Sequence, residues 1–150
     1  MTPFNLSYRP VQAHEFGDLF ILRALAMQAT PVQFGAITPA NLQKSFLAGM
    51  QNNDAWHILL DGAVIGFYAL HRAGQGLWLS QLHLHPDYHN RGIGSAVLTQ
   101  IIADADRAGL ALHVAALRGS PANRFYLRHG FVKSGEDTWD IFYRHAQGGK

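Results

Sequence analysis

The sequence predicts an α/β fold in which helices flank one central sheet. Apolar residues recur at helical spacing in some stretches and in short strand-like runs in others. These two kinds of stretch alternate along the chain, which is typical of mixed α/β domains. The chain has 150 residues, of which 48% are hydrophobic and 15% charged. That is enough for one domain with a substantial core, so we expect residues 1–150 to form a single domain.

The composition also excludes several classes of protein. The chain contains no cysteine, which rules out disulfides, cysteine-based zinc sites and cysteine nucleophiles. A formal net charge of +2 is too small to argue for a nucleic-acid partner. No apolar run reaches the length of a membrane span, and the first ten residues lack a signal-peptide pattern. We therefore expect a cytoplasmic protein that binds neither nucleic acid nor membrane.

The first half of the chain predicts one strand, two helices and a hairpin. Thr38 and Pro39 are typical of a helix start, with threonine as the cap and proline in the first turn. Asp61 and Gly62 are typical of a two-residue hairpin turn. The predicted elements are a strand over residues 5–9, a helix over 13–29, a loop over 32–37, a helix over 38–51, and strands over 55–60 and 63–72.

The second half predicts strands and helices in alternation, ending in a strand pair. The stretch from 110 to 117 is mostly apolar, which favours a central strand. Ser120 and Pro121 are typical of a helix start, and Gly130 is typical of a helix end. The predicted elements are a strand over 77–85, a helix from the glycines near residue 93 to about 107, a strand over 110–117, a helix over 120–130, and strands over 131–136 and 138–144.

A glycine loop at the start of the long helix predicts an anion site. Gly92 and Gly94 follow an apolar strand and a polar turn, and they open the helix. The first N–H groups of a helix lack intrahelical partners, and the helix dipole adds positive charge there. Arg91 offers a counter-charge. The dinucleotide fingerprint is excluded because Val97 stands where it requires glycine or alanine, and the lysine of the P-loop is absent.

The run from Leu82 to Ser95 resembles the acyl-CoA-binding motif of the GNAT superfamily of N-acetyltransferases. The block from Arg118 to Phe131, with its Pro-Ala, Phe-Tyr and Gly-Phe pairs, is similar to a second motif of that superfamily. The two motifs occur in the family's order and at about its spacing. The resemblance implies a GNAT fold: a central mixed, mostly antiparallel sheet, flanked by helices, with a splay between two parallel strands.

The resemblance also implies acetyl-CoA as the co-substrate. Backbone groups of the splayed strand would pair with its pantetheine arm, and the glycine loop would hold its pyrophosphate. The implied cofactor-binding residues are Leu82, His83, Leu84, Asn90, Arg91, Gly92, Ile93, Gly94, Ser95, Ser120 and Asn123.

One residue is implied to be catalytic. Tyr126 stands where the family has a tyrosine that acts as general acid on the leaving thiolate. Two residues depart from the family pattern. His89 replaces the usual glutamine or arginine. Ser120 replaces the usual asparagine, and we expect it to serve mainly as the helix cap.

A general base is less clearly indicated. His83 and His113 lie in the two strands expected to flank the splay, and neutral imidazole suits a base near neutral pH. The family often uses a glutamate before the loop, which is absent here. The acceptor site is expected to lie in residues 31–38 and 136–142, and the second of these segments is weakly acidic.

The sequence therefore predicts an N-acetyltransferase that moves an acetyl group to a primary amine, on a small molecule or a peptide, by direct attack in a ternary complex. No covalent enzyme intermediate is expected. The resemblance is compatible with a homodimer. One alternative is a non-catalytic acyl-CoA-binding sensor of the same fold. Another is a metal-dependent hydrolase that uses His83 and His85, which share one strand face, although no metal site is expected.

Overall fold

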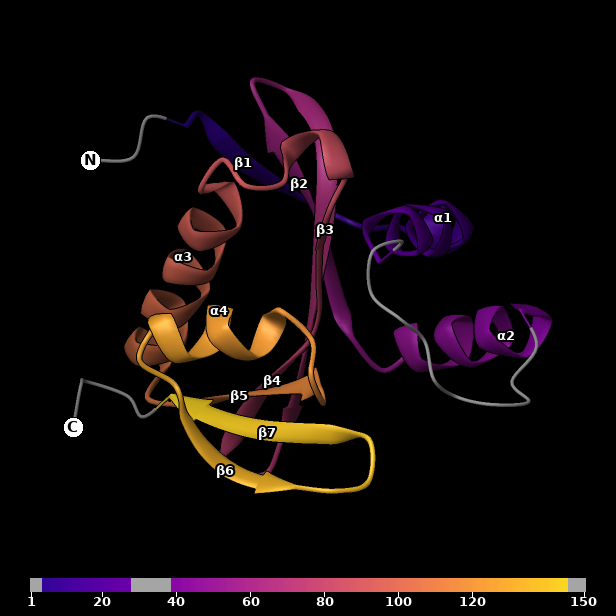
Figure 1. The fold of residues 1–150 in the computed structure, drawn as a ribbon. Helices are drawn as coiled ribbons and strands as arrows, with labels where there is room; N and C mark the ends of the chain where they lie inside the picture. Colours follow the sequence, from indigo (N-terminus) through magenta and orange to yellow (C-terminus); the bar gives the residue numbers. More distant parts are fainter. Residues whose placement is uncertain (1–3, 28–38, 146–150) are drawn as a thin grey trace. The chain divides into compact units, whose positions relative to one another are not determined.

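A computed structural model describes residues 4–27 and 39–145 of the chain. It contains a seven-stranded sheet with strand order β1-β2-β3-β4-β5-β7-β6, accompanied by helices (Figure 1). The elements are β1 (Leu6–Pro10), η1 (Ala13–Glu15), α1 (Phe16–Ala26), α2 (Pro39–Met50), β2 (Asp54–Leu60), β3 (Ala63–Ala73), β4 (Gly76–Leu84), η2 (Pro86–Tyr88), α3 (Ile93–Ala108), β5 (Ala111–Leu117), α4 (Ala122–Arg128), β6 (Val132–Glu136) and β7 (Asp140–His145).

The predicted order of helices and strands is confirmed, and two short 3₁₀ helices, η1 and η2, are added to it. The first predicted helix differs at its start, because residues 13–15 form a 3₁₀ turn before α1 begins. The Glu15 carboxylate accepts the backbone N–H of Gln12 at 2.9 Å, which holds this tighter turn. The predicted loop 32–37 and the predicted cap Thr38 lie outside the described residues.

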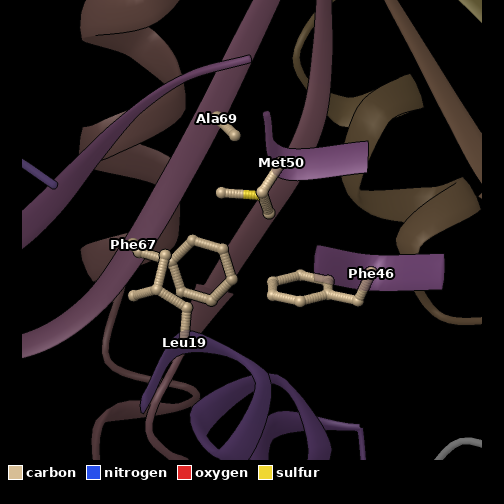
Figure 2. Packing of buried hydrophobic residues seen from close by; sticks show 5 residues of the cluster. All are labelled: Leu19, Phe46, Met50, Phe67 and Ala69. Atoms are coloured by element: carbon tan, nitrogen blue, oxygen red, sulfur yellow. The ribbon is translucent and has the colours of Figure 1, made fainter. Parts of the chain in front are cut away.

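The chain forms two compact units, and the first combines the described residues up to Ala69 with Gln81–Ile93. Its core is a cluster in which α1, α2 and β3 meet, formed by Leu19, Phe46, Met50, Phe67 and Ala69 (Figure 2). The rings of Phe46 and Phe67 meet edge to face, with their centres 6.2 Å apart. The apolar spacing of the two helices is explained by this shared core.

The second unit combines Leu70–Ser80 with the described residues from Gly94 onward. In it β5 pairs antiparallel with β7, and β7 pairs antiparallel with β6. The predicted central position of β5 is confirmed, since β5 has a neighbour on each side. The buried face of α3 includes Val97, Leu98, Ile101 and Ala105, as its helical spacing predicts.

A parallel pairing in this unit joins β4 to β5. Its register runs from Gly76↔Ala111 to Leu79↔Val114. Both strands continue beyond that point, β4 to Leu84 and β5 to Leu117. The parallel ladder thus covers only the first part of β4.

No helix within the described ranges is both long and apolar enough to cross a membrane.

Candidate functional site

The end of β4 lies very close to β3 in the first unit. A Cβ added to Gly66 of β3 would stand 2.2 Å from the His83 carbonyl oxygen, far inside van der Waals contact. Only glycine allows this approach. The sequence offered one signal for it, a glycine inside an apolar strand run, which often marks close backbone approach. Sequence reasoning did not single out Gly66.

His89 has a definite role in the turn that follows β4. Its Nε2 lies 2.8 Å from the backbone oxygen of Leu84. A carbonyl oxygen can only accept, so Nε2–H of His89 is the donor. This bond ties the end of the strand to the start of the glycine loop. The residue that departs from the family pattern thus contributes a structural hydrogen bond at the loop.

The loop itself has a backbone suited to an anion. Asn90 and Gly92 adopt left-handed conformations, with φ of +62° and +84°, while Arg91 between them does not. Alternation of this kind turns backbone N–H groups toward one concavity, known as a nest. The 16-residue helix α3 begins directly afterwards at Ile93, and its first turn carries no acidic residue. The Arg91 guanidinium lies over the Tyr88 ring, 5.5 Å from its centre.

His83 is half-buried on β4 and has polar and aromatic neighbours. Its Nε2 lies 2.8 Å from Oε1 of Gln81, and its ring centre lies 5.4 Å from that of Phe67. Burial, followed by the charges of Arg23 and His89, lowers the pKa of His83 to about 3. The imidazole is therefore neutral at physiological pH, and it is a weak proton acceptor.

In the second unit, Asn123 is fully engaged by the fold. Its Nδ2 donates to the backbone oxygens of Leu117 at 3.0 Å and Ser120 at 2.9 Å. Its Oδ1 accepts the hydroxyl of Tyr143 at 2.7 Å. Both amide hydrogens are used, so a cofactor contact from this side chain would have to replace an existing bond. Sequence reasoning missed Tyr143, which comes from β7.

The predicted cap role of Ser120 is wrong. Pro121 occupies the N-cap position of α4, and no side chain caps this helix. The chain turns at Gly119, which has φ of +83°, and the Ser120 N–H donates to the Leu117 oxygen at 3.0 Å. Ser120 therefore belongs to the turn before the helix, where its Oγ lies 3.4 Å from Nδ2 of Asn123.

Tyr126 is held firmly on α4. The N–H groups of Gly130 and Phe131 bond back to the oxygens of Leu127 and Tyr126, which is the Schellman ending of a helix. The Tyr126 ring is 8% exposed and packs against Phe131 and Tyr143, with centres 5.4 and 6.2 Å away. Burial raises the pKa of Tyr126 to about 12, so its hydroxyl stays protonated at physiological pH.

His113 lies within the paired part of the parallel ladder. It stands opposite Trp78, and the two rings stack with centres 4.9 Å apart. Burial, followed by the charge of Arg144, lowers the pKa of His113. Pairing continues one residue beyond it, to Leu79↔Val114, so His113 is not where the ladder ends. The surroundings of both candidate bases, His83 and His113, lower the basicity of the imidazole.

The histidine-rich turn does not assemble a metal site in the described part of the chain, where no three His, Asp or Glu side chains gather as ligands. His85 Nδ1 accepts the Asp87 N–H at 3.1 Å, which uses one of its ring nitrogens. The metal-dependent hydrolase therefore gains no support from these residues.

The expected acceptor segments are only partly described. Residues 31–38 lie outside the described ranges. In the β6–β7 hairpin, Glu136 pairs with Lys133 at 3.0 Å and with Arg118 at 3.2 Å. The Asp137 carboxylate accepts the backbone N–H groups of Trp139 and Asp140. The carboxylates of Glu136 and Asp137 are thus already engaged in ion pairs and hydrogen bonds within the fold.

The candidate residues fall into two local groups. The first unit brings together Leu82, His83 and Leu84 at the strand end with the loop from Asn90 to Ile93, and Gly94 and Ser95 continue into α3. The second unit brings together Ser120, Asn123 and Tyr126.

Comparison with known proteins identifies the family. Residues 51–133 match the family described as the acetyltransferase (GNAT) domain. An uncharacterised N-acetyltransferase of Mycobacterium tuberculosis is 30% identical over 122 residues, which cover 77% of this chain and 78% of that protein.

Solved structures share the fold. An acetyltransferase from Thermus thermophilus superimposes with a TM-score of 0.75 at 19% identity, covering 97% of this chain and 99% of that one. The PaiA N-acetyltransferase of Thermoplasma acidophilum, in complex with coenzyme A, has a TM-score of 0.71 at 16% identity, covering 95% and 99%. The chain therefore belongs to the GNAT family of acetyltransferases, and it is an acyltransferase.

Proposed function

We propose that this acetyltransferase moves the acetyl group of acetyl-CoA to a primary amine by direct attack in a ternary complex, and that residues 1–150 act as one catalytic domain. Acetyl-CoA is the co-substrate of a GNAT enzyme, and a structurally similar protein, the PaiA enzyme, holds coenzyme A. The observation that carries the proposal is the left-handed pair, Asn90 and Gly92, at the mouth of α3. Its N–H groups suit a pyrophosphate.

The backbone around Leu82, His83 and Leu84 is proposed to hold the pantetheine arm. The parallel ladder stops at Leu79↔Val114 although β4 runs on to Leu84, which supports this role. A strand segment beyond its ladder has backbone groups to offer a ligand, because such groups are rarely left unpaired.

The reaction forms a C–N bond and breaks the C–S bond of the thioester. The neutral amine attacks the acetyl carbonyl, whose oxygen gains negative charge and is stabilised by backbone N–H near Leu84. The Tyr126 hydroxyl donates a hydrogen bond to the leaving sulfur. With a pKa near 12, it is a weaker acid than a simple thiol, whose pKa is about 8.5. The proton that finally rests on sulfur comes from the ammonium nitrogen of the intermediate. It passes through the Tyr126 hydroxyl, which gives one proton to sulfur and takes up another.

An amine panel tests this proposal. Free thiol released from acetyl-CoA is measured with wild type and with Tyr126→Phe. The variant should bind coenzyme A and melt like wild type, but turn over at least about 10²-fold more slowly, the lower range for a general acid. Equal turnover in the two proteins would remove Tyr126 from the mechanism.

The same panel distinguishes the enzyme from the sensor alternative, which the two departures at His89 and Ser120 motivate. Binding of acetyl-CoA without thiol release for any amine would favour the sensor.

A binding titration tests the loop separately. Coenzyme A should shift the amide resonances of residues 90–95. Unmoved resonances there would overturn the proposed pyrophosphate site.

A further inference from the structure

A half-buried arginine on α1, Arg23, forms no salt bridge with a carboxylate of the described residues. The guanidinium carbon of Arg23 lies 5.8 Å from the centre of the Phe46 ring, and this is the contact found for it among the described residues. Burial lowers the pKa of Arg23, yet a guanidinium is not deprotonated in proteins. An unpaired cation held partly out of water is costly, so such groups are usually paired.

The acidic residues of the same unit do not supply that partner. Glu15 is engaged by Arg9, His57 and the Gln12 N–H, and Asp87 lies beside His85. The other carboxylates of the unit form no salt bridge with Arg23; they are Asp18, Asp54 and Asp61. Segments 1–3, 28–38 and 146–150, which lie outside the described ranges, contain no aspartate or glutamate. The described residues of this unit therefore provide no counter-ion for Arg23.

A chain of ring contacts leads from Arg23 to β4. Phe46, under the guanidinium, meets Phe67 edge to face, as Figure 2 shows, and Phe67 lies 5.4 Å from the His83 ring. His83 is neutral and its Nε2 is occupied by Gln81, so it gives Arg23 no charge. Through these ring contacts, Arg23 packs on the same core as the strand proposed to hold the acetyl-bearing arm.

We propose that Arg23 binds a carboxylate of the acceptor, so that the acceptor is an amine carrying a carboxylate, as an amino acid does. The inference rests on the proposed function and names its substrate class. One guanidinium balances one carboxylate and can bind it with two parallel N–H···O bonds. The surrounding rings lower the local dielectric, which strengthens this attraction.

The test compares acceptors that differ only in that group. Glycine and glycinamide, and phenylalanine and phenylalaninamide, are assayed with wild type, Arg23→Gln and Arg23→Lys. Wild type should prefer each acid over its amide. Arg23→Gln should reduce that preference about tenfold to a hundredfold, the effect expected for one charged hydrogen-bonding partner, and mainly through KM. Arg23→Lys should retain part of it. The matched control Lys44→Gln removes an exposed cation from α2 and should leave the preference unchanged.

A second readout does not depend on turnover. N-acetylglycine and N-acetylglycinamide are titrated against wild type and both Arg23 variants by NMR. The acid should bind wild type more tightly than the amide, and Arg23→Gln should abolish the difference. Equal binding of acid and amide by wild type, or an unchanged preference in Arg23→Gln, overturns the inference. If no amine is acetylated but the acid binds through Arg23, the proposed function fails while the carboxylate site stands.

Discussion

At the scale of single residues, the first unit holds a small charged cluster around Glu15. The Nε2 of buried His57 lies 3.1 Å from Oε1 of Glu15, and the Arg9 guanidinium lies 3.6 Å from Oε2. This contact between His57 and Glu15 is close, but it lacks the alignment of a hydrogen bond. The Gln12 N–H, followed by His57, lowers the pKa of Glu15 to about 2. Glu15 therefore joins η1, β1 and β2 through one carboxylate.

This cluster makes stability depend on pH. A carboxyl whose pKa is lowered by folding stabilises the fold above its unfolded value, near 4.5, and that contribution is lost as pH falls toward 2. Glu15→Gln should therefore lower the melting temperature at neutral pH. The gap to wild type should shrink in acid. Thermal melts from neutral pH down to about pH 2 measure this difference in melting temperature. Asp18→Asn on α1 is the control, and it should have a smaller effect. A gap that stays constant down to about pH 2 would show that charge is not the cause.

At the scale of elements, α4 is tied to two strands by one amide. Asn123 joins the end of β5, through the Leu117 oxygen, to β7, through the Tyr143 hydroxyl. Tyr126 lies one turn further along the same helix and packs on the Tyr143 ring. The position of the proposed acid therefore depends on a polar contact that is not itself catalytic.

Removing the hydrogen bond between Tyr143 and Asn123 should destabilise the fold. Tyr143→Phe leaves a partly buried amide oxygen without its donor, and it should lower the free energy of unfolding by about 1–3 kcal/mol. Chemical denaturation of Tyr143→Phe, Asn123→Ala and the double variant forms a thermodynamic cycle. We expect the double variant to lose less than the sum of the single losses. Strict additivity would mean that the two side chains do not depend on one another.

The approach of β3 to β4 is the second element-scale feature. Gly66→Ala would force a methyl against the His83 carbonyl, and overpacking of this kind costs about 1–3 kcal/mol. The matched control is Gly49→Ala on α2, where a Cβ meets nothing within 4 Å. Since alanine favours helix over glycine, that variant should gain about 0.5–1 kcal/mol. Denaturation curves compare the two, and equal effects would contradict a steric role for Gly66.

At the scale of the whole molecule, local signals predicted the order of elements well. Turn residues such as Asp61-Gly62 and helix periodicity such as that of α3 depend on neighbours in sequence, and the structure agrees with both. The place of β7 between β5 and β6 was not predicted, because strand pairing is set by contacts far apart in the chain.

In the candidate site, too, contiguous motifs could be predicted from the sequence, whereas residues that depend on tertiary contacts could not. The glycine loop and Tyr126 were found because their motifs are contiguous, although their roles remain proposals. Gly66, Tyr143 and Arg23 were missed because their significance depends on what folding places beside them. Ser120 was assigned the wrong local role, since a turn at Gly119 moved the helix start by one residue. Tertiary contacts thus override local preference at the site.

The bond from His89 to the Leu84 oxygen makes this imidazole a built-in reporter. Whenever the ring is neutral, this bond fixes Nε2 as the protonated nitrogen, and the two ring nitrogens should give well-separated ¹⁵N signals. Any ligand that loosened the turn would free the ring to exchange tautomers and draw those signals together. The ¹⁵N shifts of the His89 ring should therefore report on the state of the glycine loop without an attached dye or tag.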